Sequence, residues 1–347
     1  MEIQQAIAAL MGRNSLTREQ MRAVMKQVMT GSATPAQIGG FLVALTIKGE
    51  TVEEITGAAE VMRELATHVN VNVPVLVDTC GTGGDGAGLF NVSTASAFVV
   101  AAAGGHVAKH GNRSITSKAG SADLLEAAGV NLNITAEQVA KCVESLGVGF
   151  MFAPAHHGAM KHAIGPRREL GLRTIFNVLG PLTNPAGAKR QVLGVFDKTL
   201  CRPLAEVLKA LGSEHVMVVS SDDGLDEISL ATNTHVAELK EGVVSEYEIY
   251  PGNNGIEPQD LEGLSVNDAE ESLALIQGVF NNTEGARFSK ARDMVAINAG
   301  AALYVAGIAD SYSEGVVFAQ ETIATGLAGE KLKELAEMTA CFEVATA

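Results

Sequence analysis

The sequence is short of positive charge and of long apolar runs. Its 347 residues carry 25 Lys and Arg against 40 Asp and Glu, a formal net charge of −15. This charge argues against nucleic acid or an anionic membrane as the main partner, because both require a basic surface. No run reaches the roughly 18 apolar residues of a membrane-spanning helix, and the first residues lack the basic and apolar pattern of a signal peptide. We therefore expect no membrane and no nucleic-acid partner.

Cysteine motifs are also missing. The four cysteines form no CxxC pair and no cluster with histidine at zinc-binding spacing. Scattered thiols in a chain of this length predict a reduced, cytoplasmic protein. Hydrophobic residues make up 47% of the sequence, which is enough for one large domain or two of ordinary size.

The pattern of the chain changes near residue 70. Residues 1–70 read as helices only, and three of them begin with capping boxes: Thr17 with Gln20, Thr34 with Gln37, and Thr51 with Glu54. We predict a small α-helical domain over 1–70, to which 161–188 crosses back. Residues 71–160 and 189–347 alternate helix-like and strand-like segments, which predicts an α/β domain with a central, mostly parallel sheet flanked by helices.

The expected elements of the α/β domain follow from these patterns. We expect strands at 73–78, 106–109, 147–152, 191–195 and 215–220. We expect a helix of small residues at 93–104 and helices that begin near residues 121, 135, 201, 267 and 288. Residues 161–184 look helical, and 256–270 are polar and predicted to lie on the surface.

A glycine-rich loop follows the first expected strand. Gly81, Gly83 and Gly86 fit GxGxxG, which is typical of a dinucleotide site. A dinucleotide site also requires an acid about 20 residues later, and no acid occurs between Gly86 and Asp123. The glycines still let backbone amides approach phosphate oxygens, and the start of the next helix adds donors. The alternative is a tight turn that binds nothing.

Two stretches are basic within this acidic chain. The loop from Lys109 to Ser117 combines two cations with hydroxyl and amide donors, which suits a phosphate, although a solvated polar loop is the alternative. Residues 145–196 contain one acid, Glu169, and several arginines, one of which could bind a substrate carboxylate. The adjacent His156 and His157 need not be metal ligands, and packing or capping explains one of them equally well.

An acidic segment follows the last expected strand. Four carboxylates lie within residues 222–227, and their spacing does not match an EF-hand. Asp226 and Glu227 suit Mg²⁺, which takes a few carboxylates and shares phosphate oxygens with a substrate. A solvated acidic turn is the alternative, but two neighbouring anion sites favour magnesium. Together the three segments predict a magnesium-dependent enzyme that acts on a phosphorylated, and pyrophosphorylated, substrate.

The sequence is similar to the anthranilate phosphoribosyltransferase family in five motifs that occur in the family's order. These motifs are Gly81–Asp85, Asn91–Thr94, Lys109–Arg113, Phe176–Pro185 and Asp226–Glu227. The resemblance implies transfer of the phosphoribosyl group from phosphoribosyl pyrophosphate to the amino nitrogen of anthranilate, with release of pyrophosphate, in tryptophan biosynthesis. It also implies a homodimer formed through the small helical domain, in the fold shared with pyrimidine nucleoside phosphorylases.

The resemblance also implies roles for individual residues, with Lys109 and Arg167 as the catalytic ones. Phosphoribosyl pyrophosphate would be bound by Gly81, Gly84, Asp85, Asn91, Ser93, Thr94, Lys109, His110, Gly111, Asn112, Arg113, Ser114, Ser117 and Ser121. Anthranilate would be bound by Gly81, Asn112, His157, Arg167 and Pro181, with Arg167 on its carboxylate, and Mg²⁺ by Ser93, Asp226 and Glu227. In one departure, Leu89 stands where the family usually has Thr, so one hydroxyl donor to the substrate is missing.

Two other functions compete with this interpretation. A pyrimidine nucleoside phosphorylase of the same fold is disfavoured by Asp226–Glu227 and by the segment Phe176–Pro185. A relative that has lost catalysis and binds nucleic acid is disfavoured by the net charge of −15. The sequence leaves open whether the chain also associates with anthranilate synthase and how many magnesium ions it binds.

Overall fold

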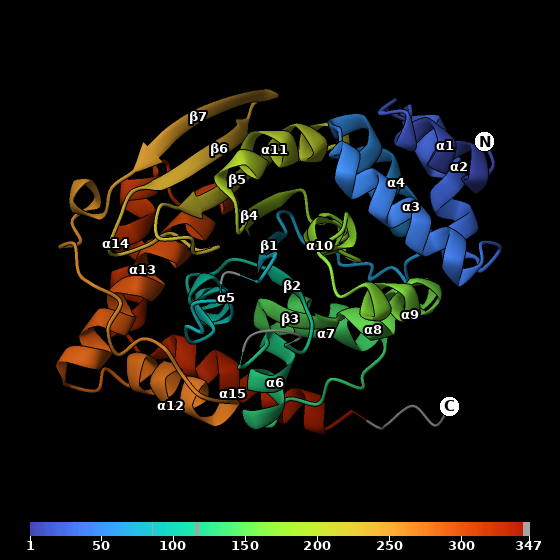
Figure 1. The fold of residues 1–347 in the computed structure, drawn as a ribbon. Helices are drawn as coiled ribbons and strands as arrows, with labels where there is room; N and C mark the ends of the chain where they lie inside the picture. Colours follow the sequence, from blue (N-terminus) through green and yellow to red (C-terminus); the bar gives the residue numbers. More distant parts are fainter. Residues whose placement is uncertain (85, 115–117, 343–347) are drawn as a thin grey trace.

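The computed structural model describes residues 1–84, 86–114 and 118–342. Their central feature is a seven-stranded sheet with the strand order β3-β2-β1-β4-β5-β6-β7 (Figure 1). The strands are β1 (Val77–Gly81), β2 (Val107–Gly111), β3 (Val148–Phe152), β4 (Arg190–Gly194), β5 (His215–Ser221), β6 (Thr234–Lys240) and β7 (Val243–Ile249). The first five strands are parallel and the last two antiparallel, which confirms the mostly parallel sheet.

Helices surround this sheet and form a separate bundle at the N-terminus. The bundle contains α1 (Ile3–Met11), α2 (Arg18–Met29), α3 (Pro35–Lys48) and α4 (Val52–Glu64). The other helices are α5 (Val92–Ala102), α6 (Ser121–Ala127), α7 (Ala136–Leu146), α8 (Ala153–His156), α9 (Lys161–Leu170), α10 (Phe176–Leu179), α11 (Cys201–Ala210), α12 (Ala269–Phe280), α13 (Ala286–Ala306), α14 (Tyr312–Ala324) and α15 (Leu327–Ala340). The helical N-terminus and the larger α/β part confirm the predicted fold class.

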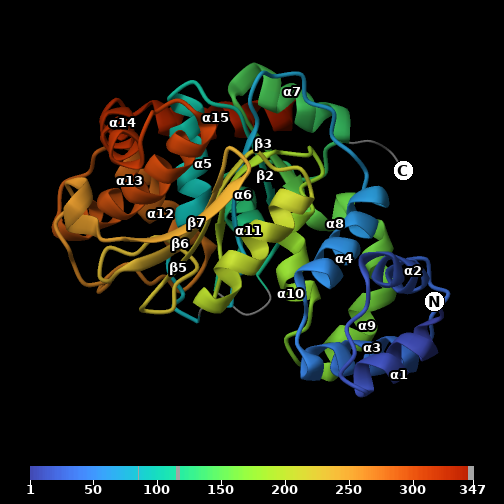
Figure 2. The same cartoon turned by 90° about the horizontal axis from the view of Figure 1, so that it is seen from above.

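The three predicted capping boxes are all present in the N-terminal bundle. In each, the threonine oxygen accepts from a backbone amide and the Gln or Glu side chain accepts from the threonine amide. Substituting such a cap typically costs about 1 kcal/mol, so these boxes help to fix where the helices begin. Helix α9, far away in the sequence, packs on α2 and α3, and Figure 2 shows it beside them.

The two faces of the sheet are covered by different helices. Helices α5 and α13 pack on one face, against β1, β2, β4 and β5, and α11 packs on the opposite face, against β5, β6 and β7. Figure 1 shows α13 and α14 on the side away from α11. The apolar core on the α11 side is continuous with the core of the N-terminal bundle. The bundle is therefore joined to the sheet through shared apolar packing.

The structure corrects several of the predicted boundaries. The segment 73–78 is not a strand as a whole: β1 begins at Val77, after Pro74, and continues into the glycine-rich motif as far as Gly81. Residues 161–184 do not form one helix, because α9 ends at Gly171, which has φ 60°. The other expected strands and helix starts lie within two residues of the observed ones.

The strands β6 and β7 were not predicted. They form an antiparallel hairpin whose turn residues, Glu241 and Gly242, both have positive φ (51° and 76°). The alternation of polar and apolar residues in the hairpin suits a sheet edge with one solvated face. None of the helices in the described part of the chain is long and apolar enough to cross a membrane.

Candidate active site

The predicted site loops leave the sheet at one edge. The chain runs outward from β1 to β2 and β3, and then returns to β4 and β5 on the other side of β1. This reversal beside β1 creates a switch point, where open α/β folds bind ligands. Strands β1 and β2 form a ladder pair only at Val77 and Val107, whereas β1 and β4 pair over all five residues. The loops after β1 and β2 therefore begin beside a gap in the main-chain ladder.

The glycine-rich loop packs against the acidic segment. A Cβ atom on Gly81 would overlap the carboxylate of Asp226, and Asp226 Oδ2 accepts a hydrogen bond of 2.7 Å from the Gly83 amide. Gly83 has φ 65°, a backbone conformation that favours glycine. Two segments predicted separately, for pyrophosphate and for metal, are thus in direct contact. The predicted residue Asp85 lies outside the described residues.

Arg173 also contacts the glycine-rich loop, and sequence reasoning gave it no role. Its Nη2 donates to the Gly84 carbonyl, and its Cζ lies 4.0 Å from the ring centroid of Phe196, just after β4. Gly84 has φ 81°, and a Cβ there would lie 3.0 Å from the guanidinium. Arg173 follows α9, so it connects the loop to the segment that packs on the N-terminal bundle.

The acidic pair is held in place by a buried asparagine on α13. Asn298 Oδ1 accepts from the Ile228 amide at 2.9 Å, and its Nδ2 donates to the Ile228 carbonyl at 3.0 Å. This clamp fixes the backbone directly after Glu227. Glu227 and Ser93 line the same small cavity beneath the carboxyl ends of β1, β4 and β5.

The chemistry of these groups fits magnesium. Carboxylates and a hydroxyl are hard oxygen ligands, and Mg²⁺ usually takes one or two carboxylates together with water and substrate phosphates. Within 1–84, 86–114 and 118–342, no three or more His, Cys, Asp or Glu side chains are grouped as a complete metal site. The protein oxygens of Ser93, Asp226 and Glu227 therefore suit an ion that is shared with a substrate.

Lys109 is a buried cation directed at this edge. It is 3% exposed, and its Nζ donates to the Thr79 carbonyl and, at 3.3 Å, to Ser93 Oγ. Burial lowers the pKa of Lys109, and the negative charge of Asp78 is the main opposing influence. The predicted Lys109 and Ser93 are thus brought together.

The Asn91 side chain, at the start of α5, already makes hydrogen bonds within the protein. The side chain of Asn91 donates to the Ala119 carbonyl at 3.1 Å and accepts from Ser272 Oγ at 2.8 Å. In this arrangement Asn91 fixes the neighbouring loop. Thr94 Oγ1 is buried and has no hydrogen-bond partner among the described residues, so this hydroxyl and the amides of the first turn supply the donors of the helix start.

The residues of the basic loop contact different partners in the structure. Gly111 lies where a Cβ would overlap Ser121 Oγ, and the carbonyl of Asn112 accepts from that hydroxyl at 3.5 Å. The guanidinium of Arg113 instead pairs with Glu126 on α6 at 2.6 Å. The Ser114 amide donates to Asp123 Oδ2 at 3.0 Å, and Ser117 lies outside the described residues.

Two buried histidines, His110 on β2 and His157 directly after α8, lie against each other. The rings of His110 and His157 have centroids 5.1 Å apart, and burial lowers the pKa of His110 to about 3 and that of His157 to about 4. Their Nε2 atoms are buried and without a partner among the described residues. The ring of His156 instead hydrogen-bonds the Thr67 carbonyl at 3.0 Å, which is a structural role.

Arg167 lies on α9, and Pro181 lies in the short helical turn directly after α10. Arg167 is half-buried on α9, with its Cζ 5.1 Å from the ring centroid of Phe176, and burial lowers its pKa. Its guanidinium is absent from the ion pairs of the described residues. The Pro181 carbonyl accepts from Gln191 Nε2 at 2.8 Å. A half-buried guanidinium without a carboxylate partner is suited to a substrate carboxylate.

The segment 256–270 does more than lie on the surface. It forms an isolated bridge between Ser265 and Leu89, and the Val266 amide donates to the Gly88 carbonyl at 3.0 Å. The Leu89 side chain packs against the core that surrounds α5. Leu89 therefore anchors the end of the glycine-rich loop by apolar contact.

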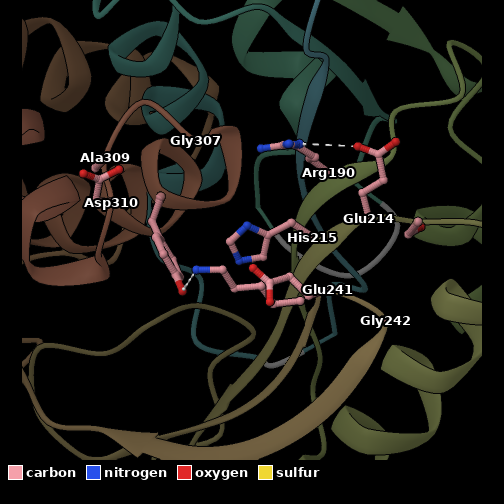
Figure 3. A pocket seen from close by; sticks show the side chains of 11 residues that line it. Arg190, Glu214, His215, Glu241, Gly242, Gly307, Ala309 and Asp310 are labelled. Carbon is pink, nitrogen blue, oxygen red and sulfur yellow. Dashed lines mark hydrogen bonds and ion pairs between the residues drawn. The ribbon is translucent and has the colours of Figure 1, made fainter.

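A larger cavity, of about 510 Å³, lies at the opposite edge of the sheet (Figure 3). It is lined by the first residues of β4 and β5 and by the end of α13. Its cations already have partners: Arg190 donates to the Val305 carbonyl at 3.0 Å, and Lys240 donates to the Tyr304 hydroxyl at 3.0 Å. None of the predicted site residues lines it. We therefore place the site at the carboxyl edge despite its smaller cavity.

Comparisons with known proteins indicate the family of the chain. Residues 73–329 match the α/β domain of a glycosyl transferase family, and 4–66 match the helical bundle domain of such a family. The chain is 66% identical to anthranilate phosphoribosyltransferase of Cellvibrio japonicus over 98% of this chain and 99% of that one. It is 65% identical to the enzyme of the same name from Hahella chejuensis, over 99% of each chain.

Solved structures give the same result. The crystal structure of anthranilate phosphoribosyltransferase from Thermus thermophilus has a TM-score of 0.91 and 42% identity, and the match covers 97% of this chain and 99% of that one. The Saccharomyces cerevisiae enzyme, in complex with phosphoribosyl pyrophosphate and Mg, has a TM-score of 0.87 and 26% identity over 98% of each chain.

Proposed function

This chain belongs to the anthranilate phosphoribosyltransferase family, and from that premise we propose its reaction and the roles of its residues. The amino nitrogen of anthranilate attacks C1 of phosphoribosyl pyrophosphate, the bond from C1 to the pyrophosphate oxygen breaks, and phosphoribosyl anthranilate and pyrophosphate form. Magnesium is the metal of the reaction. This is the second step of tryptophan biosynthesis from chorismate.

One observation carries the assignment of the site. The glycine-rich loop follows β1, Lys109 lies on β2 and the acidic pair follows β5. The contacts of Asp226 with the Gly83 amide and of Lys109 with Ser93 support a single site at this switch point. Backbone amides and a cation suit a pyrophosphate, and the adjoining carboxylates suit its magnesium. Arg167, which has no carboxylate partner among the described residues, supports a site for the anthranilate carboxylate.

The residues stabilise the charge that develops during the reaction and position the two substrates. Departure of pyrophosphate builds negative charge on the leaving group and positive charge on the ribose ring. The amides at Gly81–Gly84 and the Lys109 ammonium stabilise the leaving group, and the acidic pair with Ser93 holds magnesium, which neutralises phosphate charge. The aromatic amine needs no deprotonation before attack, so no strong base is required. His110 and His157, neutral at physiological pH, provide a polar wall without an added charge.

The intrinsic fluorescence of anthranilate tests the reaction. We expect the signal to decay only when protein, phosphoribosyl pyrophosphate and magnesium are all present. A folded protein that leaves the signal unchanged, but cleaves thymidine or uridine with inorganic phosphate, would establish the nucleoside phosphorylase instead.

Removing Arg167 tests the anthranilate site. We expect Arg167→Ala to raise the KM for anthranilate by on the order of 10- to 100-fold, since hydrogen bonds to a charged group contribute about 1.5–3 kcal/mol. The KM for phosphoribosyl pyrophosphate changes little. Steady-state kinetics with each substrate varied in turn measures both effects. Arg168→Ala, which removes the adjacent exposed cation, is the control, and unchanged anthranilate kinetics in Arg167→Ala would refute the assignment.

We also propose a homodimer formed through the helical domain, taken as residues 1–70 with 161–188. Large apolar side chains are exposed on this part: Met11 is 75% exposed, Ile47 67% and Ile164 46%. They belong to α1, α3 and α9, and α3 packs on both of the others (Figure 2). Covering such side chains is the usual purpose of an apolar interface.

The mass in solution tests this dimer. We expect twice the chain mass of 36.0 kDa by light scattering, and a shift to monomer in Ile47→Asp. Val317→Asp, at an apolar position that is 48% exposed on α14, should leave the mass unchanged. A monomeric parent protein would contradict the dimer, and a larger complex formed with added anthranilate synthase would reveal that further association.

We place the protein in the cytoplasm. All four cysteines are free thiols, and Cys80, Cys142 and Cys201 are buried. Burial raises the pKa of each of these three thiols, so they are protonated and unreactive at neutral pH. A chain whose described residues contain no disulfide suits a reducing compartment.

A further inference from the structure

A carboxylate of β1, Asp78, lies buried beneath the proposed active site. It is 0% exposed, although a charged side chain is rarely fully buried unless it is paired. The proposed mechanism gives Asp78 no task, and its neighbours on β1 are apolar or small. Its contacts therefore need an explanation.

One carboxylate oxygen replaces a missing main-chain acceptor. Strands β1 and β2 form a ladder pair only at Val77 and Val107, and beyond it Asp78 Oδ1 accepts the backbone N–H of His110 at 3.2 Å. Across the same gap, Lys109 Nζ donates to the Thr79 carbonyl. Side chains thus connect β1 and β2 beyond the Val77–Val107 pair, next to the proposed site.

The other carboxylate oxygen contacts the turn that carries Pro181. Asp78 Oδ2 accepts from Asn184 Nδ2 at 2.8 Å and from Gln191 Nε2 at 3.4 Å. The same Asn184 nitrogen donates to the Ala108 carbonyl at 2.9 Å, and the same Gln191 nitrogen donates to the Pro181 carbonyl at 2.8 Å. One side chain therefore connects the basic loop with the wall of the anthranilate site.

Stability alone does not explain why the Asp78 carboxylate is buried with these contacts. Burial raises the pKa of Asp78, while Lys109 and the hydrogen bond from Asn184 oppose that rise. Buried charges are often no better for stability than well-packed apolar residues of similar size. A carboxylate whose two oxygens accept from three segments does, however, fix the geometry of all three.

We propose that Asp78 is a positioning residue that sets the spacing between the phosphoribosyl pyrophosphate loop at His110 and the anthranilate wall at Pro181. This inference rests on the proposed function, because both sites must hold their substrates at bonding distance. A misplacement of about 1 Å can lower a rate by on the order of 10²-fold. Asp78 itself touches neither substrate.

The substitution Asp78→Asn tests the proposal. The amide has the same size, but it has only one accepting oxygen, so it cannot accept from both His110 and Asn184. We expect kcat/KM to fall for both substrates, by on the order of 10²-fold, with both KM values raised. Arg167→Ala, in contrast, affects the KM for anthranilate alone. Unchanged kinetics, or an effect on only one substrate, would overturn the proposal.

A matched control variant separates positioning from folding. Asp293→Asn changes a half-buried carboxylate on α13 that also accepts from a glutamine amide, at 2.8 Å from Gln259, and should leave the kinetics unchanged.

A second variant, Asn184→Ala, tests the proposal if Asp78→Asn does not fold. Asn184→Ala leaves the carboxylate in place and removes the contact to the Pro181 turn, so we expect both KM values to rise by about tenfold. A folded Asn184→Ala protein with parental kinetics would overturn the inference. A parent protein without transferase activity would instead refute the proposed function.

Discussion

Replacing both acids of the metal site, Asp226→Asn with Glu227→Gln, is expected to lower magnesium-dependent turnover by on the order of 10³-fold or more. A bound divalent ion contributes several kcal/mol of transition-state charge stabilisation, and each 1.36 kcal/mol corresponds to a factor of ten. Neutral amides are poor ligands for Mg²⁺. Asparagine at 226 still offers an oxygen to the Gly83 amide, which now donates to Asp226 at 2.7 Å, so the glycine-rich loop keeps its support.

Turnover measured against magnesium concentration checks this expectation. The parent protein should saturate, and the double variant should stay near the metal-free rate at every concentration. Asp222→Asn is the matched control, because Asp222 belongs to the same acidic segment but is exposed and pairs with Lys198 at 3.3 Å. Full activity of the double variant at saturating magnesium would refute the metal assignment.

Local signals in the sequence were enough for much of the fold. A capping box satisfies the first amides of a helix with side chains three residues apart, so Thr17, Thr34 and Thr51 could be identified without knowledge of the tertiary structure. Buried parallel strands are short apolar runs, which is why four of the five were placed within two residues. The exception was β1, whose second half, Thr79–Gly81, resembles a loop in composition.

The residues that the sequence did not reveal depend on contacts between distant segments. Asn298 clamps Ile228 from 70 positions away in the chain, and Arg173 reaches Gly84 from 89 positions away. An isolated sequence contains no sign of either pairing. Asp78 is different, because an acid within an apolar strand was a visible anomaly. Its partners became clear only when the strand order placed β2 and the Asn184 turn beside it.

Asn91 and Arg113 are, conversely, residues that the sequence predicted at the site but whose side chains have partners within the protein. Both have the residue type expected at a phosphate site, and both were predicted there. The structure gives Asn91 two internal hydrogen bonds, to Ala119 and Ser272, and pairs Arg113 with Glu126. Residue type therefore points to candidate loops, but it cannot distinguish a side chain that binds a ligand from one that holds the loop in place.

Lys109→Met is expected to lower both activity and stability. Loss of the ammonium should lower kcat by on the order of 10²–10³-fold, the usual effect of removing one group that stabilises developing charge. The same ammonium opposes the charge of the buried Asp78 and donates to the Thr79 carbonyl. The variant leaves that carboxylate buried without its cation, so it should also have a lower free energy of unfolding. Kinetics and urea titrations measure the two effects.

A second buried lysine gives the contrasting case. Lys48 in the N-terminal bundle is 5% exposed and pairs with the fully buried Glu54 at 2.7 Å. Lys48→Met leaves that carboxylate buried and unpaired, which typically costs about 3–5 kcal/mol, while the folded fraction should keep its kcat. Both lysines thus oppose a fixed buried carboxylate, Glu54 and Asp78, but only Lys109 is also placed to meet an anion that arrives with the substrate. A Lys109→Met protein that lost stability but kept its kcat would show that Lys109, like Lys48, only opposes a buried carboxylate. It would refute the role of Lys109 at the leaving group.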